Sequence, residues 1–375
     1  MDALTTPLPK DWEIKTFRDI STINQGLQIP ISQRLKAPTG HAKFYITIQA
    51  LNNRKEFEYI KTYNESVVCH KDDILMTRTG NTGMVITNIE GVFHNNFFKI
   101  NFDRTLINKD FLVYFLSLEQ TQKTILKKAG TSTIPDLNHN DFYSLSIPLP
   151  PLNEQAAIAN VLSDVDHYLY SLDALILKKE SVKKALSFEL LSQRKRLKGF
   201  NQAWQRVRLG DICEITTGSL DANEMVHYGK YRFYTCAKEY YFIDKYAFDT
   251  EAILISGNGA YVGYVHYYKG KFNAYQRTYV LDNFSEHIIF VKYFLTMFLQ
   301  SHIQTNRNEG NTPYIVMATL KDFEILLPPL NEQIVIANIL SALDHEIISL
   351  KNKKRQFENI KKALNHDLMS AKIRV

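Results

Sequence analysis

The residue types that support catalysis occur in this chain, but not at spacings that build a known active site. No Gly-x-x-x-x-Gly-Lys-Ser/Thr stretch is present to hold a nucleotide phosphate. Gly257 and Gly259 begin like a dinucleotide-binding loop, but the third glycine is Gly263, which falls outside the required spacing. His139 lies near two aspartates, yet isolated histidines are more often structural than metal ligands. We therefore predict a binding protein without catalytic or metal-binding residues.

Polar side chains in turns are the better candidates for function. Arginine hydrogen-bonds guanine with two donors, and asparagine or glutamine pairs in the same way with adenine, so such residues in loops favour DNA recognition. The candidates in Gly/Asn turns are Arg78, Asn81, Thr82, Asn258, Tyr261, Gln276 and Arg277. Further candidates in polar loops are Arg54, Thr131, Ser132, Arg307 and Asn311. For each of them the alternative is a plain turn, which polar Gly/Asn loops usually are.

Basic and aromatic residues extend this prediction. Phosphate contacts are predicted for Arg34, Lys36, Lys43, Lys127, Lys128, Lys230 and Arg232. Runs such as Tyr240-Tyr241-Phe242 and Tyr267-Tyr268 either stack on bases or pack inside the protein, and packing is the commoner role. The net charge of +6 favours a polyanionic partner, but the globular segments are nearly neutral, so DNA binding requires local basic patches.

A segment that occurs twice must position these loops. Residues 151–192 and 329–370 align without gaps, and half of the aligned positions are identical, which identifies an internal duplication. Each copy follows a pair of prolines, and Asn153 or Asn331 is a suitable N-cap, so we predict that a long helix begins there. Neither copy shows an apolar run near the roughly 20 residues that a bilayer crossing needs, so no membrane contact is expected.

Apolar residues in both copies recur at alternating steps of four and three, which is typical of a coiled coil. The predicted helix-pair seam consists of Ile158, Leu162, Val165, Leu169, Leu172 and Ile176 in the first copy and Ile336, Leu340, Leu343, Ile347 and Leu350 in the second. Lys179 and Lys354 interrupt the seam, and they either set its register or extend to solvent. An antiparallel pair would carry the chain from one globular segment to the other and back.

The segments before the two helices also resemble one another. Trp12 and Trp204 open similar stretches, and β-rich runs with Gly/Asn turns, a helical stretch and a last strand follow in both. We predict an α+β protein with a pseudo-twofold internal repeat, in which globular α/β domains at 1–150 and 200–328 alternate with long antiparallel coiled-coil helices at 151–199 and 329–375. Three widely spaced cysteines and the lack of a signal sequence favour a reducing, cytoplasmic location.

The Pro-Pro-Leu-x-Glu-Gln sequence before each long helix, present twice after divergent globular segments, resembles the specificity (S) subunit of type I restriction-modification enzymes. The resemblance covers essentially the whole chain and is strongest in 151–192 and 329–370. It implies that the globular segments are target-recognition domains, each reading one half of a split DNA site, while the helices set the spacing. It also implies a DNA-binding subunit rather than an enzyme.

The same resemblance implies partners that carry out the chemistry. These are double-stranded DNA, two methyltransferase (M) subunits that methylate adenine N6 with S-adenosylmethionine, and restriction/translocase (R) subunits that use ATP and Mg. No cofactor is expected in this chain. Matching residues on the outer faces of the helices would provide two docking sites, made of Asp166, His167, Lys183 and Lys184 and of Asp344, His345, Lys361 and Lys362. Two alternatives stay open: a coiled-coil scaffold that binds proteins, and the detached recognition part of a single-chain restriction enzyme.

Overall fold

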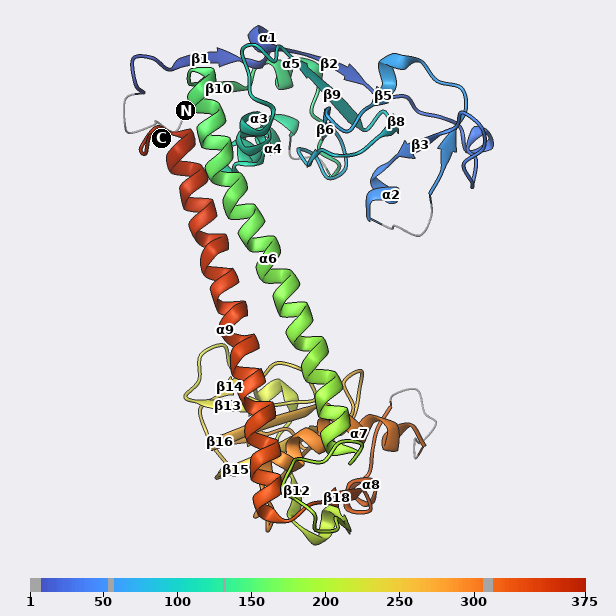
Figure 1. Ribbon diagram of the computed structural model, residues 1–375, viewed down its shortest axis with the longest axis vertical. Coiled ribbons are helices and arrows are strands. Elements are labelled where there is room, and N and C mark those ends of the chain that lie inside the picture. The colour runs from blue at the N-terminus through green and yellow to red at the C-terminus, as the bar shows by residue number, and fades with distance from the viewer. Residues whose placement is uncertain (1–7, 53–56, 131–132, 306–312) are drawn as a thin grey trace. The chain divides into compact units, whose positions relative to one another are not determined.

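The computed structural model describes residues 8–52, 57–130, 133–305 and 313–375 and divides into two compact units (Figure 1). Unit 1 combines Met1–Leu172 with Lys353–Val375, and unit 2 is Asp173–Asn352. The two long helices are α6 (Leu152–Leu191) and α9 (Leu330–Met369), and each runs without a break from one unit into the other. The described residues before α6 are called module 1, and those between α6 and α9 are called module 2.

Both long helices begin slightly earlier than the asparagine caps predicted. Asn153 and Asn331 lie inside the first turn, so the prediction that they are N-caps was wrong. In α6 the carbonyl of Pro151 already accepts the first helical hydrogen bond, from the N–H of Gln155 at 3.0 Å. A proline is tolerated at this place because the first N–H groups of a helix have no partner within the helix.

The helix α9 is more apolar than the sequence prediction allowed. It contains an 18-residue window with a mean hydropathy of 1.3, and among the described helices it alone meets the length and composition criteria for a membrane span. In unit 2, however, Ile336, Leu340 and Ile347 of this helix are buried, with exposed fractions of 1%, 0% and 6%. Yet only 28% of the window is buried, and Ile334, Val335 and Ile348 are 38%, 37% and 54% exposed.

Module 1 is built on two four-stranded sheets, with the strand orders β2-β9-β6-β7 and β4-β3-β8-β5. The strands of the first sheet are β2 (Ser21–Gln25), β9 (Phe97–Phe102), β6 (Ile74–Thr77) and β7 (Val85–Ile86). Those of the second are β4 (Tyr59–Ile60), β3 (Lys43–Ile46), β8 (Gly91–Phe93) and β5 (Val68–Cys69). The helices are α1 (Phe17–Ile20), α2 (Ile48–Asn52), α3 (Lys109–Ser117), α4 (Glu119–Ala129) and α5 (His139–Tyr143).

Module 2 has instead one six-stranded sheet with the order β12-β17-β15-β16-β13-β14. Its strands are β12 (Glu214–Thr217), β17 (Thr278–Asp282), β15 (Phe248–Ser256), β16 (Val265–Ala274), β13 (Tyr231–Tyr234) and β14 (Tyr241–Ile243), and its helices are α7 (Ile288–Thr305) and α8 (Met317–Lys321). The long β16 pairs with both β15 and β13, whereas in module 1 the separate strands β7 and β8 make the equivalent pairings with β6 and β3. One continuous strand therefore joins in module 2 what module 1 keeps as two sheets.

In each module the first strand pairs with the last. β1 (Glu13–Thr16) is antiparallel to β10 (Ser146–Leu149), and β11 (Gln205–Arg208) is antiparallel to β18 (Glu324–Leu327). Because β10 and β18 directly precede α6 and α9, the chain enters and leaves each module at the start of a long helix. The sequence predicted the last strands but not these pairings.

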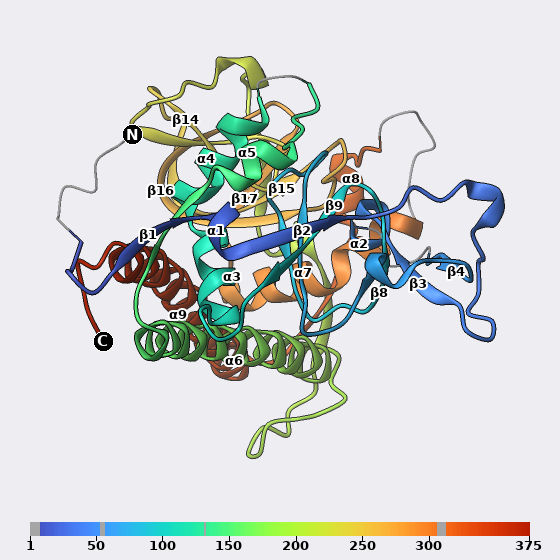
Figure 2. The ribbon, with the colours of Figure 1, turned by 90° about the horizontal axis from the view of Figure 1, so that it is seen from above.

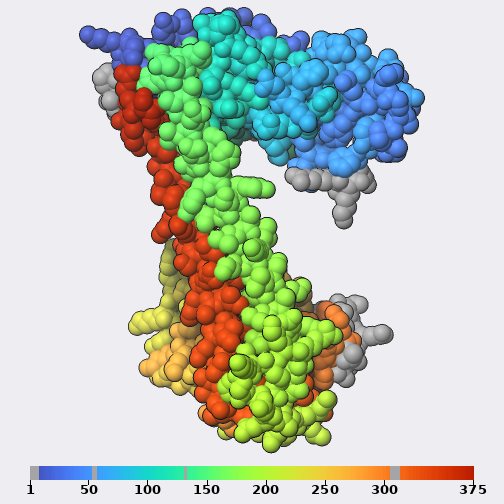
Figure 3. Space-filling model, viewed as in Figure 1, coloured from blue at the N-terminus to red at the C-terminus, as the bar shows by residue number. Residues whose placement is uncertain are grey.

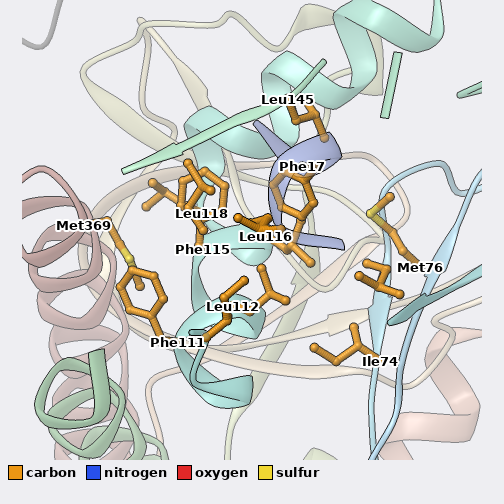
Figure 4. Packing of buried hydrophobic residues seen from close by; sticks show 14 of the residues in the cluster. Phe17, Ile74, Met76, Phe111, Leu112, Phe115, Leu116, Leu118, Leu145 and Met369 are labelled. Atoms are coloured by element: carbon orange, nitrogen blue, oxygen red, sulfur yellow. The ribbon is translucent and has the colours of Figure 1, made fainter. Parts of the chain in front are cut away.

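Each unit has its own hydrophobic core, and both long helices contribute to both cores. In unit 1, Met369 of α9 lies next to Phe111 of α3 (Figure 4), and Ile158 of α6 belongs to the same cluster. Figure 2 shows the last turns of α9 beside the first turns of α6, close to α3. In unit 2 the core includes Leu191 of α6 and Ile336 of α9. The helix ends are thus part of the module interiors.

Within each unit the two long helices run antiparallel, and their side chains meet along their length (Figure 3). As the numbers along α6 rise, those of its partners on α9 fall: Asp166 meets Lys361 and Tyr168 meets Phe357 in unit 1, and Lys179 meets Glu346 and Lys183 meets Asp344 in unit 2. The predicted α+β fold with two modules and a pair of antiparallel helices is confirmed.

The predicted seam residues are all buried or half-buried. Ile158 and Leu162 belong to the core of unit 1, and Ile336 and Leu340 to the core of unit 2, so these four also contact the modules. Lys179, which interrupts the seam, extends to α9, where its Nζ lies 2.7 Å from an oxygen of Glu346.

Candidate nucleic-acid interface

A buried carboxylate at the start of each long helix fastens the module to the helices. Glu154 accepts a hydrogen bond from Nε1 of Trp12 at 3.2 Å, and Arg374 donates to both of its oxygens at 2.9 and 2.7 Å. Only 6% of Glu154 is exposed. The equivalent contacts in unit 2, at 3.0–3.3 Å, are made by Glu332, Trp204 and Arg196. We call these two sets the helix-start clamps.

The glutamine that follows each clamp glutamate binds the module backbone. Gln155 accepts a hydrogen bond from the N–H of Asn108 at 2.9 Å and donates to the carbonyls of Leu106 and Pro150 at 2.9 and 2.8 Å. Gln333 makes the same kind of contacts to His287 and Pro328 at 3.0 and 2.8 Å. The Glu-Gln pair therefore positions the modules. Sequence reasoning used it only as a motif, although its presence in both copies pointed to such a role.

A second pair of equivalent contacts ties each module to both helices. In unit 2, Asp344 accepts a hydrogen bond from the hydroxyl of Tyr293 at 2.6 Å and from the Lys183 ammonium. Burial alone would raise the pKa of the Asp344 carboxyl, but the bonds from Lys183 and Tyr293 outweigh burial and lower it. Tyr114, Lys361 and Asp166 repeat the arrangement in unit 1, with oxygen contacts of 2.8 and 2.5 Å.

These contacts use half of the residues predicted to form docking sites on the outer helix faces. Asp166, Lys361, Asp344 and Lys183 are half-buried and form ion pairs with the other long helix. The remaining members are exposed, namely His167, Lys184, His345 and Lys362. They occupy matching places in the two copies.

In the first predicted DNA-contact turn, two of the three residues are engaged within module 1. Nη2 of Arg78 lies 2.7 Å from the Asp136 carboxylate, and its guanidinium carbon is 5.6 Å from the centre of the Phe98 ring. Thr82 is buried and donates a hydrogen bond to the carbonyl of Pro135 at 2.7 Å. Asn81 is exposed. The structure therefore gives Arg78 and Thr82 a role in holding the turn and leaves Asn81 open to a ligand.

Lys43 lies on β3, in the other sheet of module 1. Its Nζ is 3.8 Å from a carboxylate oxygen of Glu90, and 29% of its side chain is exposed. It is therefore not part of the turn that contains Arg78 and Asn81.

The predicted residues of module 2 lie in two neighbouring turns. Gln276 donates to the Asp221 carboxylate at 2.9 Å, while the exposed Arg277 forms no ion pair with any carboxylate in the described part of the chain. Asn258 is half-buried. Tyr261 is 43% exposed, and the Lys238 ammonium lies 5.2 Å from the centre of its ring.

An open cavity of about 360 Å³ lies beside the Tyr261 turn. Its lining residues include Tyr261, Tyr264, Lys238, Gln300 and Gln304. Rings, amides and a cation together suit a planar polar ligand such as a nucleobase. A larger cavity of about 760 Å³, between the end of α6, α7 and the β11–β18 ribbon, contains none of the predicted residues.

Five predicted residues lie outside the described part of the chain: Arg54, Thr131, Ser132, Arg307 and Asn311. Within the described ranges, no group of three or more His, Cys, Asp or Glu side chains is arranged to hold a metal ion.

The duplicated architecture has a direct counterpart among known families. The family model of the type I restriction modification DNA specificity domain matches residues 9–179 and again residues 201–359. The chain belongs to this family. The two matches include both modules and extend into both long helices, so this is a specificity subunit with two copies of the domain.

Relatives and solved structures agree with this assignment. The EcoDI specificity subunit of Escherichia coli is 38% identical over 170 residues, which are 44% of this chain and 37% of that protein. The MjaVIII specificity subunit of Methanocaldococcus jannaschii is 24% identical over 98% of this chain and 94% of its own length. The crystal structure of a type I S subunit from M. genitalium has a TM-score of 0.63 at 18% identity and covers 97% of this chain and 98% of its own. The HsdS subunit of Thermoanaerobacter tengcongensis has a TM-score of 0.51.

Proposed function

We propose that this specificity subunit reads a split DNA site, with one half-site for each module, and that partner subunits carry out the chemistry. The observation that carries the proposal is the pair of helix-start clamps. Two modules with different loops are fastened by equivalent Glu, Trp and Arg residues to equivalent places on two copies of one helix. This arrangement keeps the attachment of the modules to the helices constant, while the loops that would contact DNA can differ.

The helices supply a means of setting the spacer between the half-sites. Each is 40 residues long, and at a rise of about 1.5 Å per residue it spans roughly 60 Å. This length corresponds to about 18 base pairs at about 3.4 Å each. Two modules attached to such helices would suit half-sites that lie one or two turns of duplex apart.

The exposed residues that match on the two helices support two equivalent docking sites for methyltransferase subunits. These are His167 and Lys184 on α6 and His345 and Lys362 on α9. In this proposal the methyltransferase subunits bring S-adenosylmethionine, and restriction subunits bring ATP and Mg. The specificity subunit itself positions DNA and carries no cofactor, and it works in the cytoplasm, where its DNA is.

Sequencing of methylated adenines in cells with and without the gene tests the proposal. We expect a split motif, methylated in both half-sites, that disappears when the gene is deleted. Loss of the gene with no change in the methylation pattern would instead favour a protein-binding scaffold. Replacing the loops of one module should change one half-site and leave the other as it was.

A further inference from the structure

One arginine on the sheet of module 2 is held between two aromatic rings, as no other basic residue in the described ranges is. The guanidinium carbon of Arg232 lies 4.2 Å from the centre of the Tyr240 ring and 4.5 Å from that of Tyr268. Nη1 also donates to the hydroxyl of Tyr234 at 3.4 Å. Two rings and one hydrogen bond therefore fix both the position and the plane of the guanidinium.

The fixed guanidinium keeps most of its hydrogen-bonding capacity free. Arginine has five N–H donors, and no carboxylate in the described residues forms an ion pair with Arg232. None of its other nitrogens is buried without a hydrogen-bond partner, and the residue as a whole is half-buried. Tyr240 and Phe242 beside it are 38% and 39% exposed. An oriented, half-buried cation without a carboxylate partner among the described residues can bind an acceptor.

The equivalent position in module 1 holds a ring instead of a cation. β3 and β13 each pair antiparallel with one strand and parallel with another. Phe44 faces Tyr59, which also bridges to Leu35, and Arg232 faces Phe242, which also bridges to Val226, so Phe44 corresponds to Arg232. The Phe44 ring packs against the rings of Phe57 and Tyr59, whereas module 2 places a guanidinium between rings.

We propose that Arg232 is a base-reading residue of module 2 that recognises a guanine in the second half-site. This inference rests on the proposed reading of a split site and names one residue and one base within it. A guanidinium can also bind a phosphate with two parallel hydrogen bonds, and the selection below separates a phosphate from a base. A fixed guanidinium plane matters where two parallel hydrogen bonds must meet O6 and N7 of one guanine edge.

The test uses the full-length chain in complex with its methyltransferase subunits and selects bound duplexes from a random pool. For the wild type we expect a guanine at one position of the second half-site. In Arg232→Gln the preference for that guanine should fall about 5- to 150-fold, with a gain for adenine, which glutamine pairs with. The first half-site should stay unchanged, and this shows in the same molecules that the complex is folded.

Two further variants keep the result decisive. Tyr240→Ala removes one ring and retains the arginine, so it should weaken the guanine preference by a smaller factor, and it carries the test if Arg232→Gln does not assemble. Arg206→Gln is the matched control, because Arg206 is exposed and paired with Glu324 at 2.6 Å, and it should leave the motif unchanged.

Three outcomes would overturn the inference. The first is a second half-site of the wild type without guanine. The second is an unchanged motif in Arg232→Gln with affinity lowered equally for all sequences and a salt slope reduced by about one, which is the behaviour of a phosphate contact. The third is a wild type that selects no split motif at all, and this result would also overturn the proposed function.

Discussion

The guanidinium of Arg374 lies 2.7 Å from the carboxylate of Glu154, although 220 residues separate them in the sequence. The same arginine is 2.6 Å from Asp11. The two ends of the described chain therefore meet in unit 1, at the start of α6. In unit 2, Arg196, which follows the first repeat, reaches Glu332 at the start of the second. The arginine that follows each copy of the repeat thus binds the glutamate of the other copy.

Gln155→Ala should destabilise unit 1. The amide of Gln155, 1% exposed, bonds three backbone groups, and its removal leaves a buried N–H and two carbonyls without their partner. We expect a loss of about 2 to 3 kcal/mol in the free energy of unfolding. Thermal unfolding and amide hydrogen exchange in 97–172 provide the measurement. Asn153→Ala, an exposed change on the same turn, is the control, and equal losses in both variants would contradict the role given to Gln155.

Asp344 should make the stability of unit 2 dependent on acid pH. Its pKa in the folded protein is below the ordinary value of 3.8, so the folded state binds the proton more weakly than the unfolded state. The stabilisation is therefore complete above 3.8 and is lost as the pH falls through the lower folded pKa. Urea unfolding of the wild type and Asp344→Asn between about pH 7 and pH 3 should show the two converging in acid. A constant difference across this range would contradict the prediction.

Neighbouring residues of the first turn should separate recognition from stability. Asn81→Ala alters an exposed side chain, so we expect a changed preference in the first half-site with stability altered by less than about 0.5 kcal/mol. Thr82→Val removes the buried hydrogen bond to Pro135 and should reduce stability by about 1 kcal/mol without changing the motif. Motif selection and urea unfolding of both variants check this pair of expectations. The reverse pattern would mean that the turn is read through Thr82.

Shortening the two long helices together should shorten the spacer. Deleting 170–176 and 349–355 removes two helical turns from each and preserves the seven-residue pattern. Each helix loses about 10 Å, or about 3 base pairs of duplex. Methylation-motif sequencing should then show the same half-sites with a shorter spacer. A deletion in only one helix should instead disrupt the pairing and lower stability, and an unchanged spacer in the double deletion would rule out a spacing role for the helices.

The sequence predicted the parts of this structure that repeat or alternate over long stretches. The duplicated segment gave α6 and α9, and the alternating runs gave β3, β13 and β15, because local periodicity decides such elements. It did not predict that Arg78 is paired, since its partner Asp136 is 58 residues away and becomes a neighbour only after folding. The helix-start clamps could have been predicted, because a Glu-Gln pair that occurs in both copies is unusual for an exposed first turn.

The pairing of first and last strands in each module also has an evolutionary consequence. The ribbons β1–β10 and β11–β18 bring the first and last strands of each module together at the start of a long helix. The helix-start clamp there uses a single tryptophan from the module itself. A recombination event that exchanges the segment between these two strands must preserve only a few contacts with the rest of the protein. Such an exchange would give the gene product a new DNA half-site and leave its helix pair unchanged.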